Sequence, residues 1–424
     1  MNGRRDFMKQ AGAAAVTVGF PAIISAQSVT NAIKVGLVGC GGRGGGAARQ
    51  ALTADDYAEL TAVADIDQGQ VDRMLGNLKR SAKLAPRVKV EADRQYLGLD
   101  AYDKVIHSGV DVVLLATPPG FRPQHLAACI DAGRHVFCEK PIATDGPGVR
   151  SVLATTDKAA AKKLNLVSGF CWRYNNMIQE TFDQIEKGAI GKIVAYYATY
   201  YTSPVKPMPP ESARPAGMSD TEWQIRNWYN FVWLGGDSLV EQAVHSADKI
   251  AWAMHDQPPV SCVGVGGRMV PNETGNIYDH FEINYVYPNG VRAFLANRQI
   301  LNCHNENSDY ILGSEGTCTI GKGPVPRIEG KTSWTFTGQQ YDMYQREHDI
   351  LFAAIRKGDV INNGKRMATS TLLAMMGRMA AYTGQEITWE QALNSQTHLV
   401  PEKLDWKGKL DVMPIAVPGQ TKFA

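Results

Sequence analysis

Three ionisable residues, Lys140, Glu241 and His245, have the types and local context needed to move a proton at a hydroxyl group. Lys140 follows a strand-like run, residues 135–138, and stands directly before Pro141. The residue before a proline is restricted to extended or turn backbone, so we expect Lys140 at the end of a strand with its ammonium facing a ligand. A lysine in this place can donate a hydrogen bond to a substrate oxygen and relay a proton.

Glu241 and His245 follow the pair Gly235-Gly236 in a stretch of helical character. Residues four apart share one face of a helix, so the Glu241 carboxylate would orient the His245 imidazole and raise its basicity. A general base that removes the proton of a carbinol needs this property. A lone histidine on a helix is more often structural, so the assignment depends on its surroundings. Asp248 is expected to brace the helix.

A glycine-rich turn near the start of the chain predicts the cofactor that such chemistry requires. A strand-like run, residues 33–38, leads into the turn and is followed by helix-like residues 45–54. The order is strand, Gly-x-Gly-x-x-Gly, helix, in which glycines let the backbone approach a pyrophosphate at a helix N-terminus. We expect a nicotinamide or flavin cofactor held by Gly39, Gly41, Gly42, Arg43 and Gly44.

Asp65 ends a second strand-like run, residues 58–64, and lies 26 residues after Gly39. A carboxylate near this distance binds the ribose hydroxyls of NAD and would repel the 2′-phosphate of NADP, so the sequence favours NAD. Asp65 could instead cap the following helix, and Asp67 could take either role.

From residue 33 to about residue 170, short apolar runs alternate with helical stretches, as in a doubly wound parallel sheet. Residues 110–116 are almost wholly apolar, as a strand buried on both faces should be, and end at Thr117-Pro118-Pro119. Proline cannot continue the strand, so a loop opens at the sheet edge where such folds bind ligands. The cofactor-binding candidates therefore also include Thr117, Pro118, His125, Glu139 and Lys140.

Beyond residue 171, strand-like runs follow one another with hairpin signals between them, as in an antiparallel sheet. The clearest runs are residues 192–201, 260–270, 278–287 and 291–299, with Pro288-Asn289-Gly290 as one turn.

These patterns predict an α/β protein with an N-terminal Rossmann domain, which is a doubly wound parallel sheet, and a C-terminal α+β domain with a large open antiparallel sheet. Helices at 341–357 and 368–382 are expected to pack around the second sheet. The expected divisions are 31–170 for NAD binding, 171–400 for substrate binding and oligomerisation, and 401–424 as a C-terminal extension.

Residues 203–234 are rich in proline and aromatic side chains. A connection of this length and composition is usually a functional lid or a domain-packing arm. Aromatic faces suit sugar rings, but tryptophan clusters are more often core or interface, and the sequence leaves both interpretations open. The candidates for substrate contact are Lys140, Tyr200, Trp228, Tyr229, His245 and His304.

Residues 1–26 differ in kind from the rest of the chain. Arg4-Arg5 and Lys9 precede an uncharged stretch, residues 10–25, and a small-residue site at Ser25-Ala26, a pattern typical of a twin-arginine signal peptide. We expect export through the twin-arginine machinery, to the periplasm or otherwise out of the cytoplasm, with cleavage near Ala26 and no membrane association afterwards.

The charge of the remaining chain is balanced, because the signal holds three of the 44 basic and one of the 42 acidic residues. This balance argues against nucleic acid or an anionic membrane as a partner. The seven cysteines lack C-x-x-C or zinc-type spacing and are interpreted as buried thiols. His245, Glu241 and His304 are conceivable metal ligands, but no local spacing supports a metal site, and we expect none.

Together these motifs resemble the Gfo/Idh/MocA family of glucose-fructose oxidoreductases and inositol dehydrogenases, over essentially the whole length after the signal. The resemblance rests on the glycine turn, on Thr117-Pro118, on Glu139-Lys140-Pro141 and on Gly235-Gly236, which lead to an acid four residues before His245. It implies a Rossmann domain plus an open-sheet domain that makes homo-oligomer contacts.

The resemblance also implies that Lys140, Glu241 and His245 carry catalysis and that Trp172 and Arg173 lie against the nicotinamide. Glu241 departs from the family, in which aspartate is commoner, and this change moves the carboxylate farther by a methylene group. Direct contact between Glu241 and the substrate is therefore left open.

The leading hypothesis is an NAD-dependent oxidoreductase acting on a CH–OH group of a sugar, glycoside or cyclitol. His245 would take the hydroxyl proton while Lys140 polarises the oxygen. An exported enzyme meets no dependable pool of NAD, so the cofactor is expected to be tightly bound and regenerated in place. The alternative is a redox-neutral NAD-dependent glycoside hydrolase that works by oxidation, elimination and re-reduction, and a non-catalytic nucleotide- or sugar-binding module is a third hypothesis.

Overall fold

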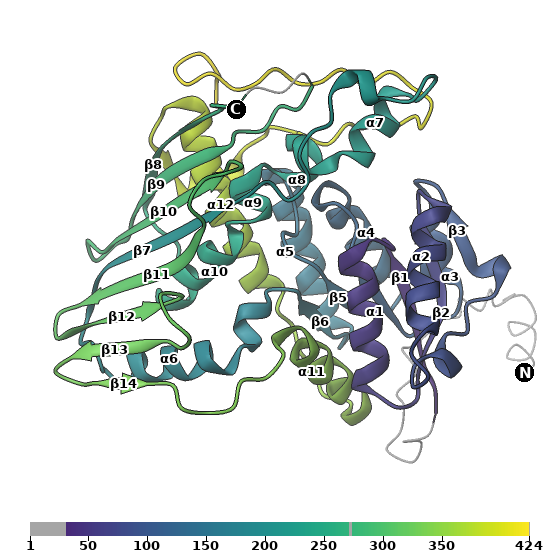
Figure 1. Ribbon diagram of the computed structural model, residues 1–424, viewed down its shortest axis with the longest axis horizontal. Coiled ribbons are helices and arrows are strands. Elements are labelled where there is room, and N and C mark those ends of the chain that lie inside the picture. The colour runs from purple at the N-terminus through teal and green to yellow at the C-terminus, as the bar shows by residue number, and fades with distance from the viewer. Residues whose placement is uncertain (1–30, 271–273, 424) are drawn as a thin grey trace, which may run out of the picture.

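The computed structural model describes residues 31–270 and 274–423. The predicted signal, residues 1–26, lies outside the described residues. The described chain forms two sheet-based parts that lie side by side (Figure 1). None of the helices within these ranges combines the length and the apolar character that a membrane span requires.

The N-terminal part is built on six parallel strands in the order β3-β2-β1-β4-β5-β6. The order reverses between β1 and β4, which opens the crevice where doubly wound sheets bind ligands. The predicted Rossmann fold is confirmed. Its elements are β1 Ile33–Val38, α1 Gly42–Ala54, β2 Ala58–Asp65, α2 Gln68–Lys79, β3 Gln95–Leu97, α3 Ala101–His107, β4 Val112–Leu115, α4 Arg122–Asp131, β5 His135–Cys138, α5 Gly146–Ala161 and β6 Leu166–Ser168.

Strand β4 is buried on both faces, as its apolar run predicts. Val112 and Leu114 enter the core with α1 and α2, whereas Val113 and Leu115 enter the core with α3 and α4. Each of these side chains is fully buried, which stabilises the fold by about 1.5–3 kcal/mol per side chain. The end of β4, where Thr117 follows, is therefore held firmly at the ligand-binding edge.

Helix α11 Met343–Lys357 comes from the C-terminal half of the chain but packs against α1. Its Leu351, Phe352 and Ile355 belong to the core of the nucleotide-binding sheet. The prediction that this helix packs on the second sheet is therefore wrong. Its apolar stripe can be buried against either sheet, and helical periodicity does not say which.

The second sheet has nine strands in the order β14-β13-β12-β11-β7-β10-β9-β8-β15. Strands β7 and β10 run parallel, and the other neighbours run antiparallel. The predicted turn at 288–290 joins β9 to β10 with Gly290 at a φ of 80°. The strands are β7 Ile193–Thr202, β8 Ser261–Gly267, β9 His280–Val286, β10 Arg292–Gln299, β11 Glu306–Gly313, β12 Gly316–Ile320, β13 Arg327–Gly330, β14 Trp334–Thr335 and β15 Ile387–Thr388.

Helices α6 Asn176–Glu186, α10 Val244–Ala253 and α12 Gly364–Thr383 pack on the inner face of this sheet (Figure 1). Helix α12 also contacts α5, so one core joins the two parts.

Four short helices of the described chain remain, of which α7 and α8 are labelled in the upper part of Figure 1. They are α7 Asp220–Arg226, α8 Val232–Gly235, α9 Ser238–Glu241 and α13 Trp389–Asn394, followed by an irregular C-terminal segment that lies beside α7.

Candidate active site

The glycine turn after β1 has the shape of a pyrophosphate cradle. Gly39 has a φ of 95°, and a Cβ there would lie 2.8 Å from the Ala116 carbonyl, while a Cβ on Gly44 would overlap the Gly39 carbonyl oxygen. A Cβ on Gly41 or Gly42 would meet open space. Among the described residues no side chain caps α1, so its first N–H groups remain available to an anion. The turn therefore fits a dinucleotide.

Asp65 and Asp67, which the sequence left with interchangeable roles, differ in the structure. Asp65 accepts hydrogen bonds from the N–H groups of Cys40 (2.6 Å) and Asp67 (3.0 Å), which hold its carboxylate beside the glycine turn. Burial raises the pKa of Asp65, although these backbone donors oppose the shift. Asp67 caps α2 by accepting from the Gly69 N–H at 2.7 Å. Asp67 is therefore the residue that caps α2, and Asp65 is not needed for that cap.

A cavity of about 420 Å³ opens at this edge of the parallel sheet. Its volume lies within the range of small-molecule sites. The structure brings seven predicted residues to its lining: Gly39, Gly41, Asp65, Thr117, Pro118, His125 and Trp228.

His125 forms part of the apolar end of this cavity. Its ring stacks on Tyr102 with the centroids 4.0 Å apart, and its Nδ1 lies 3.2 Å from the Thr117 hydroxyl. Burial, followed by the nearby charge of Arg122, lowers the pKa of His125 to about 3. The imidazole is therefore neutral at physiological pH and contributes a flat, uncharged surface.

Lys140 and Glu241 meet across 101 residues of sequence. The Lys140 Nζ lies 3.2 Å from the Glu241 Oε1 and donates to the Glu241 carbonyl oxygen at 2.6 Å. The two side chains are only 11% and 7% exposed, and Gln242 donates to the other carboxylate oxygen of Glu241. The ammonium is therefore held in one position with hydrogen-bonding capacity left for a ligand.

The continuous helix predicted through Glu241 and His245 is wrong. Helix α9 ends at Glu241 and α10 begins at Val244. In a continuous helix the His245 N–H would donate to the Glu241 carbonyl, but Lys140 binds that carbonyl and His245 donates to Gln242 at 3.3 Å. The Glu241 carboxylate consequently positions Lys140, and its predicted contact with His245 is absent among the described residues.

His245 lies edge-on to Phe170, with ring centroids 6.4 Å apart. Its Nδ1 is buried and has no hydrogen-bond partner within the described part of the chain. Burial, followed by the charges of Lys140 and Lys249, lowers the pKa of His245 well below its usual value, so the prediction that Glu241 raises the basicity of His245 is wrong. A neutral imidazole with an unpaired nitrogen can accept a hydrogen bond or a proton from a ligand hydroxyl.

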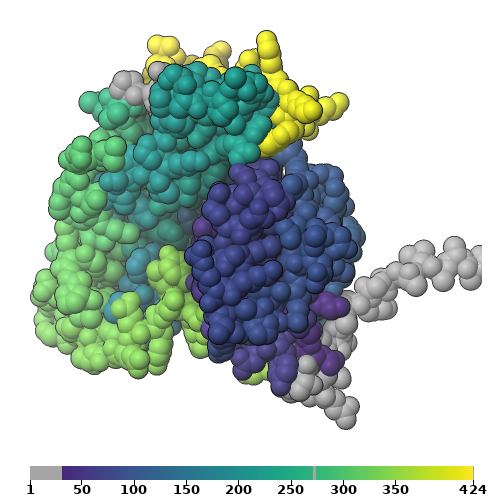
Figure 2. All heavy atoms as spheres, turned by 45° about the vertical axis from the view of Figure 1, so that its right-hand side comes forward, coloured from purple at the N-terminus to yellow at the C-terminus, as the bar shows by residue number. Residues whose placement is uncertain are grey.

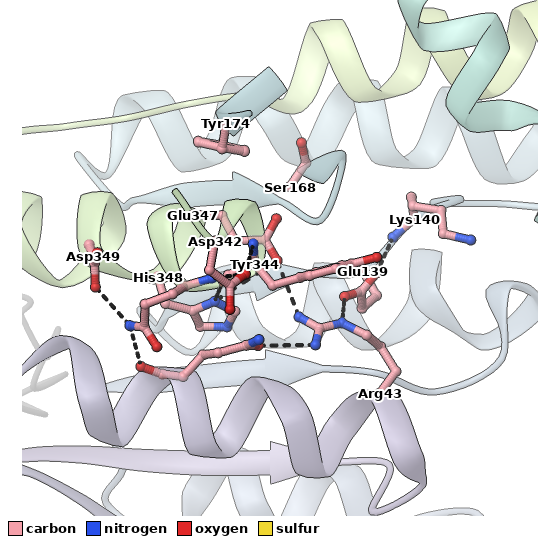
Figure 3. Close-up of polar contacts among 12 residues, drawn as sticks. Arg43, Glu139, Lys140, Ser168, Tyr174, Asp342, Tyr344, Glu347, His348 and Asp349 are labelled. Atoms are coloured by element: carbon pink, nitrogen blue, oxygen red, sulfur yellow. Dashed lines mark hydrogen bonds and ion pairs between the residues drawn. The ribbon is translucent and has the colours of Figure 1, made fainter. Parts of the chain in front are cut away.

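Arg43 and Glu139, both predicted to bind the cofactor, are tied to each other. The Arg43 Nε donates to Glu139, and its Nη2 lies 3.1 Å from the Glu347 carboxylate (Figure 3). Burial alone would raise the pKa of Glu139, but Arg43 and Arg122 hold it below its usual value, whereas burial and Glu139 raise the pKa of Glu347. This network fixes the glycine turn to β5 and α11.

Figure 3 also shows that the Lys140 side chain points away from this network. The Lys140 N–H donates to Glu139 at 3.1 Å, so Glu139 anchors the backbone while the ammonium faces the other way. A direct contact of Glu139 or Arg43 with the cofactor stays a prediction.

Trp172 and Arg173 have structural partners. Arg173 binds the Asp248 carboxylate at 3.0 Å and Asp256 at 2.7 Å, and it is only 6% exposed. Asp248 thereby braces α10, as expected. The Lys249 ammonium lies above the Trp172 ring, with its Nζ 5.4 Å from the ring centroid. These contacts occupy the Arg173 guanidinium, and contact of Trp172 and Arg173 with the nicotinamide stays a prediction.

The substrate candidates divide into two groups. The Tyr200 hydroxyl donates to Gln242 at 3.2 Å, and Tyr229 stacks on Trp228 with centroids 3.7 Å apart. Burial, followed by the charge of Glu241, raises the pKa of Tyr229. His304 is separate from this group, since its exposed side chain lies 3.4 Å from Glu306.

Two family models match the chain. One, described as an oxidoreductase family with an NAD-binding Rossmann fold, covers residues 33–168, and the GFO/IDH/MocA C-terminal domain covers residues 178–319. The chain belongs to the Gfo/Idh/MocA family.

Curated relatives of this Gfo/Idh/MocA chain include inositol dehydrogenases. Inositol 2-dehydrogenase 2 of Saccharopolyspora erythraea is 24% identical over 53% of this chain and 60% of its own length. Inositol 2-dehydrogenase of Rubrobacter xylanophilus is 23% identical over 68% of this chain and 71% of its own. The chain thus spans about 60% of the length of the first of these relatives.

Solved structures share the fold. The apo scyllo-inositol dehydrogenase from Lactobacillus casei superposes with a TM-score of 0.63 at 18% identity, over 85% of this chain and 99% of the other. A levoglucosan dehydrogenase, in complex with NADH and levoglucosan, gives a TM-score of 0.66 at 16% identity, over 84% and 99%.

Sequence reasoning missed one buried cation beside the site of this Gfo/Idh/MocA protein. Arg122, at the start of α4, is 4% exposed and donates to the Pro141 carbonyl, so it holds the turn that presents Lys140. Its Nε is buried without a partner among the described residues. An arginine before a proline carries no local signal of such a role, because the contact depends on how α4 packs against β5.

Proposed function

We propose that the protein is an oxidoreductase that uses tightly bound NAD to oxidise a CH–OH group of a sugar, glycoside or cyclitol. The observation that carries the proposal is the meeting of Lys140 with Glu241, four residues before His245, whose buried Nδ1 has no partner among the described residues, at the edge of a sheet whose glycine turn fits a dinucleotide. The names of its relatives, which include inositol and levoglucosan dehydrogenases, support the substrate class.

The chain's own residues offer places for two parts of NAD, the pyrophosphate and the adenosine ribose. Gly39, Gly41 and Gly42 would hold the pyrophosphate, and Asp65 the adenosine ribose hydroxyls. When bound, NAD supplies the acceptor for the hydride that leaves the carbinol carbon. The Asp65 carboxylate lines the same cavity and would repel a 2′-phosphate, which supports NAD over NADP.

The side chains at the site have separate tasks in the proposed reaction. His245 accepts the hydroxyl proton as the carbon loses hydride and the C–O bond becomes a carbonyl. Lys140 donates a hydrogen bond to the same oxygen and stabilises the negative charge that develops on it. Glu241 keeps the Lys140 ammonium in place. In the reverse direction the His245 imidazolium returns the proton to the oxygen.

Two further parts of the proposal concern the cellular location of the enzyme and its oligomeric state. The Arg4-Arg5 motif and the uncharged stretch after it support export through the twin-arginine machinery to the periplasm, and export favours a cofactor that stays bound. The outer face of the nine-stranded sheet exposes Tyr197, Val265 and Tyr310, which supports a homo-oligomer formed through this face.

The test is the near-ultraviolet spectrum of the protein purified without added cofactor, recorded before and after adding sugars, cyclitols and aryl glycosides. A reduced-nicotinamide band that persists until a carbonyl compound is added supports the proposal. Aglycone release without a lasting band would assign the redox-neutral hydrolase instead. Absence of nicotinamide from the purified protein would refute tightly bound NAD.

A further inference from the structure

The cavity at the sheet edge has an outer wall that the glycine motif does not predict. Its inner wall includes Asp65, Ile66 and Leu99, at the ends of β2 and β3. Since Asp65 marks the ribose of the adenosine half, this end of the cavity receives that half of the dinucleotide. The outer wall comes from residues 203–234, called the arm below, and consists of Lys206, Met218, Trp223, Ile225, Arg226, Asn227 and Trp228.

One ion pair joins the two walls. The Arg226 Nη1 lies 2.6 Å from the Asp67 carboxylate, and its Nε lies 2.7 Å from Glu222, which belongs to the arm itself. The hydrogen bond from Arg226 lowers the pKa of Asp67, so the pair stays ionised at neutral pH. Asp67 is in turn fixed to the start of α2 by its capping bond. The contact therefore links the arm to the nucleotide-binding sheet at the cavity.

Apolar packing holds the arm in the same place. Phe231, Trp233 and Leu234 are buried in a cluster that also takes in Leu99 and Phe121 of the nucleotide-binding part. Phe121 meets Trp233 edge-on, with centroids 5.9 Å apart. Lifting the arm would expose this cluster to water, which opposes opening in proportion to the apolar area exposed.

The C-terminal segment, residues 395–416, fastens the arm from outside and is called the strap below. It begins on the nucleotide-binding part, where the Leu399 N–H donates to Asp145 at 2.9 Å. It then crosses the arm, where Gln224 donates to the Leu410 carbonyl at 2.7 Å and Trp406 packs into the apolar cluster. Figure 2 shows the teal arm seated on the blue nucleotide-binding part with the yellow strap beside it.

We propose that the arm and the strap make NAD a resident group: the cofactor exchanges only when the Arg226–Asp67 pair parts and the arm lifts from the adenosine end of the cavity. The inference rests on the proposed function, because it concerns the same cofactor. On this proposal NAD is released slowly because the arm and the strap, which come from distant parts of the chain, close the cavity. Arg226 then slows the release of NAD and takes no part in catalysis.

The experiment measures exchange directly. Protein loaded with radiolabelled NAD is mixed with excess unlabelled NAD, and the label that stays bound is followed by rapid gel filtration. R226Q is expected to release NAD about fivefold faster than the unmodified protein, the factor that a partly exposed ion pair contributes. W406A, which removes apolar packing from the strap without touching the cavity, is expected to release it about tenfold faster.

Glu222→Gln is the matched control, because it removes the partner of Arg226 within the arm and leaves the contact with Asp67. Its release rate should stay within about twofold of the unmodified protein, and R226K should restore most of the retention. Equal rates for R226Q and the unmodified protein overturn the inference, as does equal acceleration by E222Q. Bound NAD that exchanges within the mixing time in every protein overturns the inference and the tight binding of NAD, but leaves the proposed oxidoreductase activity in place. A protein that binds no nicotinamide nucleotide refutes the proposed function itself.

Discussion

Gly42 offers a substitution that separates cofactor binding from folding. A Cβ on Gly42 meets no atom within 4 Å, and the residue is the first of α1, with no left-handed backbone. Alanine forms helix more readily than glycine, so Gly42→Ala should leave the fold intact and raise the free energy of unfolding by up to about 1 kcal/mol. The new methyl group would occupy the space in which the pyrophosphate is expected.

The effect on binding follows from the hydrogen bonds that are lost. A phosphate displaced from the start of α1 loses charge-assisted bonds to backbone N–H groups, each worth about 1.5–3 kcal/mol. Loss of two such bonds weakens NAD binding by roughly a hundredfold to ten-thousandfold. The assay combines the nicotinamide content of the purified variant with its thermal unfolding in the absence and presence of NAD.

Gly44→Ala is the contrasting variant, because a Cβ there would overlap the Gly39 carbonyl oxygen. It should lose stability and NAD binding together. The reasoning is refuted if G42A binds NAD as tightly as the unmodified protein, since the open space beside Gly42 would then not be the pyrophosphate site.

Three further predictions concern charged groups. Lys140→Met should reduce hydride transfer by about a thousandfold or more while bound NAD is retained; loss of the cofactor, measured after denaturation, would make Lys140 a binding residue instead. Arg43→Met removes the cation that binds the buried Glu139 and should lower the free energy of unfolding in urea by about 3–5 kcal/mol. Glu347→Gln keeps a hydrogen-bonding side chain beside Arg43 and should cost less, because burial and Glu139 raise the pKa of Glu347 and disfavour its charged form; equal costs would contradict this assignment. Burial raises the pKa of Asp237 to about 6, above its unfolded value of about 4, so the folded state binds this proton more tightly and the free energy of unfolding falls as the pH rises from about 4 to about 6. Asp237→Asn should remove roughly 2–3 kcal/mol of that fall between pH 4 and 7, and an unchanged slope in urea unfolding would show that Asp237 does not titrate in this window.

Much of the nucleotide-binding part could be predicted because its signals are local. The glycine turn, the apolar run of β4 and the acid at the end of β2 each follow from sterics or burial within a short stretch of chain. The break between α9 and α10 could not be predicted in the same way, because the Glu241 carbonyl accepts from the ammonium of Lys140, which reaches it from the end of β5, about a hundred residues earlier in the chain.

The sequence by itself determined which residue types were available for chemistry and which backbone shapes the turns around them allow. Only the tertiary structure decided their partners: Glu241 with Lys140, Arg43 with Glu139, and Arg226 of the arm with Asp67. These pairs join residues about a hundred or more positions apart. These pairs form only when the two sheets, the arm and the strap pack against each other. The pattern of apolar and polar residues along the chain does not predict that packing.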